Sequence, residues 1–101
     1  MSKRRVVITG LGAVTPVGND IPAFWAAIQE GKCGVALITL YDTENNKCKL
    51  AAEVKDFQPE QFLDKKELRH MDRFTQFALV AAREAMQDSG LNMEQEDATR
   101  C

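Results

Sequence analysis

The sequence is poor in the residues that metal sites, disulfide frameworks and nucleic-acid surfaces require. It has one histidine, and its three cysteines, Cys33, Cys48 and Cys101, lack Cys-x-x-Cys spacing, so neither a zinc site nor a disulfide framework is indicated. The 13 basic and 15 acidic residues leave a net charge of −2, whereas nucleic-acid binding needs a basic surplus. These shortages predict reduced thiols, no metal and no nucleic-acid partner.

Long hydrophobic runs are also missing. The longest purely apolar stretches, such as Phe77 to Ala82, have six residues, far fewer than the roughly 20 that cross a bilayer. The basic start Lys3-Arg4-Arg5 resembles the first part of a signal peptide, but Val6-Val7-Ile8 gives way at once to Thr9-Gly10 and leaves no apolar centre for such a peptide. We therefore predict a cytoplasmic protein without a membrane span.

What is present is the composition of one ordinary soluble domain. The 101 residues are 45% hydrophobic and 28% charged, which predicts one hydrophobic core. A chain of this length buries only about two-thirds of its unfolded surface. Catalysis in a deep cleft is therefore not expected from this chain alone.

The first third of the chain predicts a strand, a turn and a helix. Val6-Val7-Ile8 is β-branched and lacks polar alternation, which indicates a central strand buried on both faces of a parallel sheet. The glycines and proline of residues 10–18 indicate a sharp turn at the strand's carboxyl end. A short amphipathic helix is predicted over about residues 20–30, capped by Asn19 or Asp20 and ended by Gly31.

The middle of the chain predicts an exposed strand and a short helix. Residues 35–41 fit either a strand or a coil, and residues 42–46 read as a surface loop. Residues 47–55 alternate apolar and polar side chains in the period of a half-exposed strand. Pro59 can open a helical turn, and Asp64 with Glu67 resembles a capping box, so a helix is expected to start near Lys65.

The last predicted element is a long helix from Asp72 to Ser89 that Gly90 ends. Apolar side chains crowd most of its circumference and leave a narrow polar stripe, so the helix is predicted to be largely buried. Its alanines permit close approach of a neighbouring segment. The polar stripe consists of Gln76, Arg83, Glu84 and Gln87.

Two motifs have both a chemical and a structural interpretation. Gly10-x-Gly12 follows a strand as in the dinucleotide-binding fingerprint, but the third glycine is missing and the helix begins only near Asp20, which favours a structural turn. The cysteines and His70 offer a thiolate-imidazole pair. The charged surroundings of His70 favour a solvated or capping histidine instead, and Cys33, next to Lys32, would be reactive only if exposed.

A run of cations precedes the long helix. Its members are Lys65, Lys66, Arg69, His70 and Arg73. Positions 66, 69, 70 and 73 would share one face of a continuous helix, and such a patch fits an acidic or phosphate-bearing partner. A solvated face neutralised by Asp64, Glu67 and Asp72 explains the spacing equally well.

Several longer motifs occur together in one order. The first runs from Arg4 to Asn19 and reads RRVVITGLGAVTPVGN. The others are Phe24-Trp25, Gly31-Lys32-Cys33-Gly34, Tyr41-Asp42-Thr43, Val54-Lys55-Asp56-Phe57, Arg69-His70-Met71-Asp72-Arg73-Phe74 and Ala85-Met86-Gln87-Asp88-Ser89-Gly90-Leu91. In this order and spacing they resemble the bacterial β-ketoacyl-acyl carrier protein synthase II family, the elongating condensing enzymes of fatty acid synthesis. The resemblance covers the whole chain.

The resemblance implies an α/β fold of the thiolase type, in which residues 1–101 form an N-terminal part of the first of two duplicated halves. Family members are homodimers that catalyse decarboxylative Claisen condensation of malonyl- and acyl-acyl carrier protein. They use a cysteine nucleophile, two histidines and a lysine, and no metal or organic cofactor. The family's Thr-Ala-Cys-Ser-type elbow does not occur in this sequence. Cys33, Cys48 and Cys101 therefore do not inherit the catalytic role, and no catalytic residue is assigned.

The resemblance also implies a docking role for the cationic run. Family members bind the acidic acyl carrier protein through a basic surface before the long helix, which corresponds here to Lys66 and Arg69, with His70 and Lys65 assisting. Surface charges of this kind contribute mainly to steering and orientation.

Two hypotheses follow for the chain as a whole. In the first it is a piece of a full condensing enzyme, because the sequence stops where a further core strand is due; in the second it is a noncatalytic fragment that at most docks acyl carrier protein. We favour the first. The isolated 101 residues are expected to lack condensing activity and to be marginally stable, because Val6 to Ile8 would have no partner strands.

Overall fold

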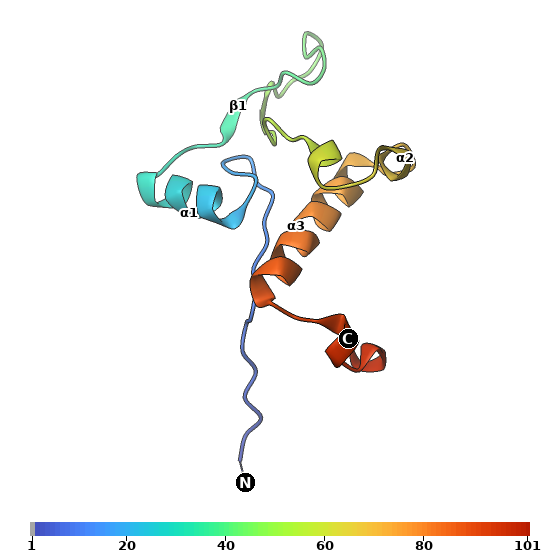
Figure 1. Cartoon of the computed structure of the whole chain (residues 1–101). Coiled ribbons are helices and arrows are strands. Elements are labelled where there is room, and N and C mark those ends of the chain that lie inside the picture. The colour runs from blue at the N-terminus through green and yellow to red at the C-terminus, as the bar shows by residue number, and fades with distance from the viewer. Residues whose placement is uncertain (1) are drawn as a thin grey trace.

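The computed structural model describes residues 2–101, so Met1, which the expected domain includes, lies outside the described residues. The described residues form helices, one small sheet and short 3₁₀ turns joined by long loops (Figure 1). In chain order the elements are α1 (Ile21–Glu30), β1 (Val35–Leu37), β2 (Leu50–Ala52), η1 (Pro59–Gln61), α2 (Lys65–Leu68), α3 (Arg73–Ser89), η2 (Met93–Gln95) and η3 (Ala98–Arg100).

Helix α1 confirms the expectation for residues 20–30. The carboxylate of Asp20 accepts a hydrogen bond from the backbone N–H of Ala23 at 2.8 Å, which makes Asp20 the N-cap residue. Gly31 ends the helix in the left-handed region, with φ of 70°, where a residue with a Cβ atom would be strained. Both ends of the helix are therefore set by residues that adjoin it in the sequence.

The two strands form an antiparallel hairpin. Val35 pairs with Ala52 and Leu37 with Leu50, so the first half of residues 35–41 is strand and the rest is loop. The predicted strand over residues 47–55 shortens to three residues. The alternation of residues 47–55 places Leu50 on the inward face, but the structure shows the reverse: Leu50 is 54% exposed while Ala51 is half-buried. No described segment covers the Leu50 face of the hairpin.

The expected central strand at Val6 to Ile8 is wrong for this structure. Residues 2–14 have no regular secondary structure, and the part before Gly10 runs as an extended arm away from the other elements (Figure 1). Val6 is 92% exposed and Ile8 is 81% exposed. A strand requires a neighbour that accepts and donates its ladder of hydrogen bonds. No other described segment lies beside these residues in that way.

The residues at the inner end of this arm pass very close to α3. A Cβ atom built on Gly12 would lie 1.8 Å from the carbonyl oxygen of Ala81, and one on Gly10 would lie 2.2 Å from that of Ala85. Only glycine permits this backbone-to-backbone contact. The expectation that the alanines of the long helix admit a close neighbour is confirmed.

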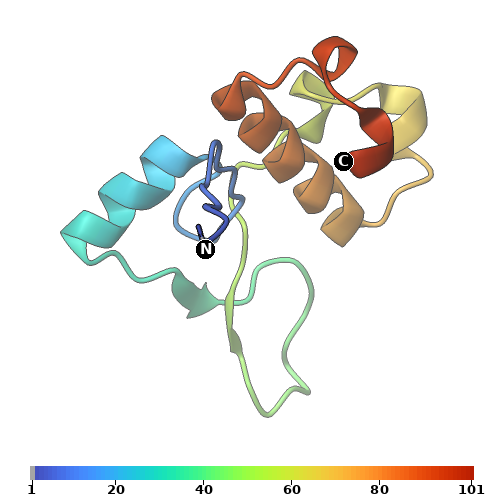
Figure 2. The ribbon, with the colours of Figure 1, turned by 90° about the horizontal axis from the view of Figure 1, so that it is seen from below.

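Helix α3 has the expected bounds, with Gly90 in the left-handed region at φ of 67°. The expectation that it is largely buried is wrong, because Val80 is its one buried residue and Phe74 is 70% exposed. The cause is the open shape of the chain, which Figures 1 and 2 show from two directions. The radius of gyration is 17.6 Å, whereas a compact chain of this length has about 13 Å. The described residues therefore do not form the single core that the composition predicts.

Candidate functional site

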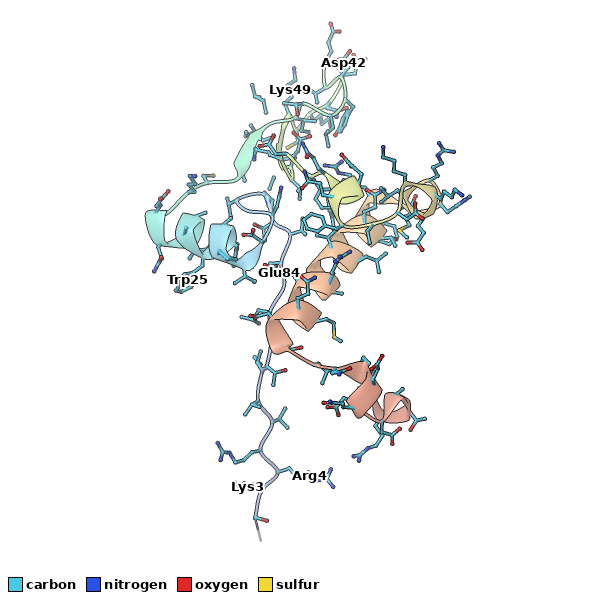
Figure 3. The ribbon with its side chains drawn as sticks, viewed as in Figure 1. Lys3, Arg4, Trp25, Asp42, Lys49 and Glu84 are labelled. Atoms are coloured by element: carbon cyan, nitrogen blue, oxygen red, sulfur yellow. The ribbon has the colours of Figure 1, made fainter. Side chains whose placement is uncertain are left out.

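Four of the predicted cations lie together on and after α2. We call Lys65, Lys66, Arg69 and His70 the basic segment. Lys65 and Lys66 form the first turn of α2, whose N-cap Asp64 accepts a hydrogen bond from the backbone N–H of Lys66 at 3.1 Å. All four side chains are exposed, and nitrogen-tipped side chains around α2 point away from the rest of the ribbon (Figure 3). The basic segment is thus presented to solvent.

The cations of the basic segment are not paired with neighbouring carboxylates. Within residues 2–101 the one ion pair joins Lys32 to Glu30 at 3.9 Å. The predicted neutralising acids are Asp64, Glu67 and Asp72, which equal the lysines and arginine of the segment in number. Asp64 caps α2, and within residues 2–101 none of the three forms an ion pair with a cation of the segment. The side chains therefore remain available to an acidic partner, although the local net charge is small.

The expected continuous helical face through residues 66, 69, 70 and 73 is wrong. Helix α2 ends at Leu68, and α3 begins only at Arg73. Between them Asp72 is extended, with ψ of 159°, while His70 and Met71 make turn-type backbone hydrogen bonds to Glu67 and Leu68. The residues of the basic segment therefore lie on α2 and on the turn that comes after it, and Arg73 belongs to a different element.

The glycine loop at residues 10–18 is closed to phosphate. The backbone N–H of Leu11 donates to the carboxylate of Asp88 at 3.0 Å, and that of Ala13 donates to Glu84 at 3.0 Å. A phosphate-binding loop keeps such N–H groups free for the ligand and excludes negative side chains. The structural interpretation of Gly10-x-Gly12 is confirmed, because the N–H groups of Leu11 and Ala13 donate to two acids of α3.

Glu84 is the main structural residue that the sequence did not single out. One carboxylate oxygen binds the N–H of Ala13, and the other accepts the N–H of Ile21 at 2.9 Å, at the first turn of α1. The residue thus joins α3 to the glycine loop and to α1. Its place in the predicted polar stripe gave no sign of this joining role. A signal that could have revealed the role is an acidic residue that lies, half-buried, beside the alanines of the helix.

Lys55 has a similar structural role near the hairpin. Its ammonium group donates to the carbonyl oxygens of Pro16 at 3.3 Å, Gly34 at 3.4 Å and Glu53 at 3.3 Å. These carbonyls belong to the glycine loop, to the residue just before β1 and to the residue just after β2. Lys55 is therefore occupied within the chain and is not part of the basic segment.

Glu53 holds the loop that follows β1. Its carboxylate accepts hydrogen bonds from the backbone N–H and hydroxyl of Thr39, each at 3.0 Å, and from the backbone N–H of Leu40 at 3.2 Å. The Thr39 backbone hydrogen bond is the largest cause of a lowered pKa at Glu53. Near neutral pH this carboxylate is ionised and fixes the loop.

The cysteines show no catalytic arrangement. All three are exposed, and the thiols of Cys33 and Cys48 lie near backbone carbonyls of their own segments, those of Val35 at 3.9 Å and Leu50 at 3.4 Å. No hydrogen bond joins a thiol to His70 among residues 2–101. In the same residues no group of histidine, cysteine and acidic side chains is arranged to hold a metal ion, and no helix has the length and apolarity to cross a membrane.

Known proteins resemble the chain over almost its whole length. The family model described as the β-ketoacyl synthase N-terminal domain matches residues 3–101. The 3-oxoacyl-[acyl-carrier-protein] synthase 2 of Coxiella burnetii is 49% identical over 100 residues, covering 99% of this chain and 24% of the relative. The enzymes of the same name from Staphylococcus aureus strain COL and Synechocystis sp. are 50% and 46% identical, covering 96% and 90% of this chain and 23% and 22% of the relatives. The chain spans about a quarter of the length of these curated relatives.

Two solved ketosynthase structures share the fold of this chain. The ishigamide ketosynthase/chain length factor superposes with a TM-score of 0.83 at 36% identity, covering 92% of this chain and 23% of that one. A type II polyketide ketosynthase in complex with its acyl carrier protein superposes with a TM-score of 0.67 at 23% identity, covering 90% of this chain and 23% of that one. The expected α/β fold, an N-terminal portion of the thiolase-like architecture, is confirmed. The chain belongs to the β-ketoacyl synthase family, whose N-terminal domain its residues 3–101 match.

Proposed function

We propose that the chain is part of a 3-oxoacyl-acyl carrier protein synthase, an acyltransferase that elongates fatty acids. In this reaction the enzyme holds an acyl group as a cysteine thioester and malonyl-acyl carrier protein loses CO₂. The resulting carbanion attacks the thioester carbonyl, the C–S bond breaks, and the cysteine thiolate leaves. The family match over residues 3–101 carries the proposal. The nucleophile, histidines and lysine of the reaction lie outside these 101 residues, which form an N-terminal part of the first half of the fold.

The identities favour fatty acid elongation over polyketide synthesis. The relatives named 3-oxoacyl-[acyl-carrier-protein] synthase 2 are 46–50% identical to the chain, whereas the type II polyketide ketosynthase is 23% identical to it. The proposed protein acts in the cytoplasm as a homodimer and needs no cofactor.

The contribution of this chain is docking of acyl carrier protein. We propose that the basic segment receives acidic side chains of the carrier protein, in both its acyl- and malonyl-loaded forms. Its exposure and its lack of ion pairs within residues 2–101 support this role. So does the related polyketide ketosynthase, which was solved with its carrier protein bound.

The alternative is a noncatalytic fragment that only docks the carrier protein. The intact mass of the natural protein, compared with its open reading frame, separates the two. A mass near 11.3 kDa with no condensation of acyl- and malonyl-acyl carrier protein would support the fragment. A larger protein that condenses them would support the enzyme. In the experiments below, the encoded protein means the product of the whole reading frame.

Docking is tested by charge reversal in the encoded protein. We expect Lys66→Glu combined with Arg69→Glu to raise KM for acyl carrier protein about tenfold with kcat unchanged, because exposed charges each contribute up to about 1 kcal/mol and act on encounter. Lys49→Glu is the matched control, since Lys49 is an exposed lysine in the loop beside Asp42, away from α2 (Figure 3). An equal KM for the double variant and this control would refute the docking assignment.

A further inference from the structure

Arg73 differs from the cations of the basic segment because its side chain is already occupied. The guanidinium group donates to the carbonyl oxygen of Val54 at 3.3 Å. Its central carbon lies 5.2 Å from the ring centroid of Phe77 and 5.8 Å from that of Phe57. The two rings meet edge to face, with centroids 4.8 Å apart. Arg73 therefore joins the segment after β2 to the first turns of α3 by a hydrogen bond and cation–π contacts.

A second arginine of α3 holds the same segment farther along. The guanidinium group of Arg83 donates to the carbonyl oxygen of Phe62. Arg73 and Arg83 are ten residues apart on one helix, which separates them by about 15 Å. Residues 54–62 are thus fixed to α3 near both ends, and the chain leads from there through Leu63 and Asp64 directly into α2.

From this arrangement we infer that Arg73 is a positioning residue for the docking surface and not a further docking cation. The inference rests on the docking role proposed above. By fixing residues 54–57 against α3, Arg73 sets where the following η1 and α2 lie and hence where the basic segment points. A rigid, planar guanidinium that stacks on rings and donates at the same time is suited to this task, and lysine is not an equivalent replacement.

The test compares the ionic-strength dependence of carrier-protein binding among variants of the encoded protein. A cation that touches the partner makes affinity fall as salt rises, so removing it flattens that dependence. We expect Arg73→Ala to weaken binding of malonyl-acyl carrier protein threefold to tenfold by the same factor at every salt concentration. Arg73→Lys is expected to restore little of the loss. Lys66→Ala is expected to weaken binding and to flatten the salt dependence.

Three other results would overturn the inference, and each leads to a different conclusion about docking. Full affinity in Arg73→Lys with a flattened salt dependence in Arg73→Ala would make Arg73 a docking cation. Wild-type binding in both Arg73 variants, with Lys66→Ala impaired, would remove Arg73 from docking while leaving the proposed function intact. Wild-type binding in Lys66→Ala as well would refute the docking role itself. If Arg73→Ala does not fold, Arg73→Lys and its salt dependence decide alone.

Discussion

Removal of the Glu84 carboxylate is expected to loosen the glycine loop and the start of α1 together. Its two oxygens accept the backbone N–H groups of Ala13 at 3.0 Å and Ile21 at 2.9 Å. A hydrogen bond to a charged group contributes about 1.5–3 kcal/mol. Because the site is half-buried, water replaces part of each interaction, and we expect Glu84→Ala to cost about 3 kcal/mol in local opening free energy. This corresponds to roughly hundredfold faster amide exchange.

Hydrogen exchange of the encoded protein, followed at the Ala13 and Ile21 amides, measures this effect directly. Glu84→Gln is expected to show an intermediate acceleration, because its carboxamide keeps one acceptor oxygen and loses the other. Gln87→Ala is the control, since Gln87 lies on the same helix and its side chain makes no hydrogen bond within residues 2–101. Unchanged exchange in Glu84→Ala, or equally fast exchange in Gln87→Ala, would refute the reasoning.

Two further predictions concern the glycine loop and helix end near α1, and the loop that Glu53 holds. Gly12→Ala places a Cβ atom 1.8 Å from the carbonyl oxygen of Ala81. Urea unfolding of the encoded protein should show a free energy of unfolding lower by at least about 2 kcal/mol. Gly31→Ala, which meets open space at φ of 70°, should cost only about 1 kcal/mol; equal losses would contradict the close contact. Because its folded-state pKa is lowered, Glu53 stabilises its loop above its ordinary pKa and loses this effect as pH falls through the lowered value. The Thr39 amide resonance should therefore shift on NMR titration only as the pH falls below the ordinary pKa of a glutamate side chain, and a shift that persists in Glu53→Gln would exclude this cause.

The helices and their ends could be predicted because their signals are local. Asp20 caps α1 through a residue three positions away, and Gly31 and Gly90 end α1 and α3 where the backbone turns left-handed. Family membership was also readable, since the motifs lie in continuous stretches of the chain. The alanines of the long helix predicted close approach of a neighbouring segment, but they did not show that this segment would be Gly10 to Gly12.

The roles of individual charged residues depended on the tertiary structure. Glu84, Lys55 and Arg73 each bind backbone groups between about 20 and 70 residues away, and no local pattern specifies such partners. The helical face assumed for the basic segment failed because the break between α2 and α3 moves Arg73 to another element.

The sequence by itself determined the helices, their caps and the family, because hydrogen bonds and side-chain contacts within a few residues decide them. Only the tertiary structure decided the state of Val6 to Ile8. Their β-branched side chains favour an extended backbone, but a strand also needs hydrogen-bond partners from a distant segment, and within residues 2–101 these side chains remain exposed.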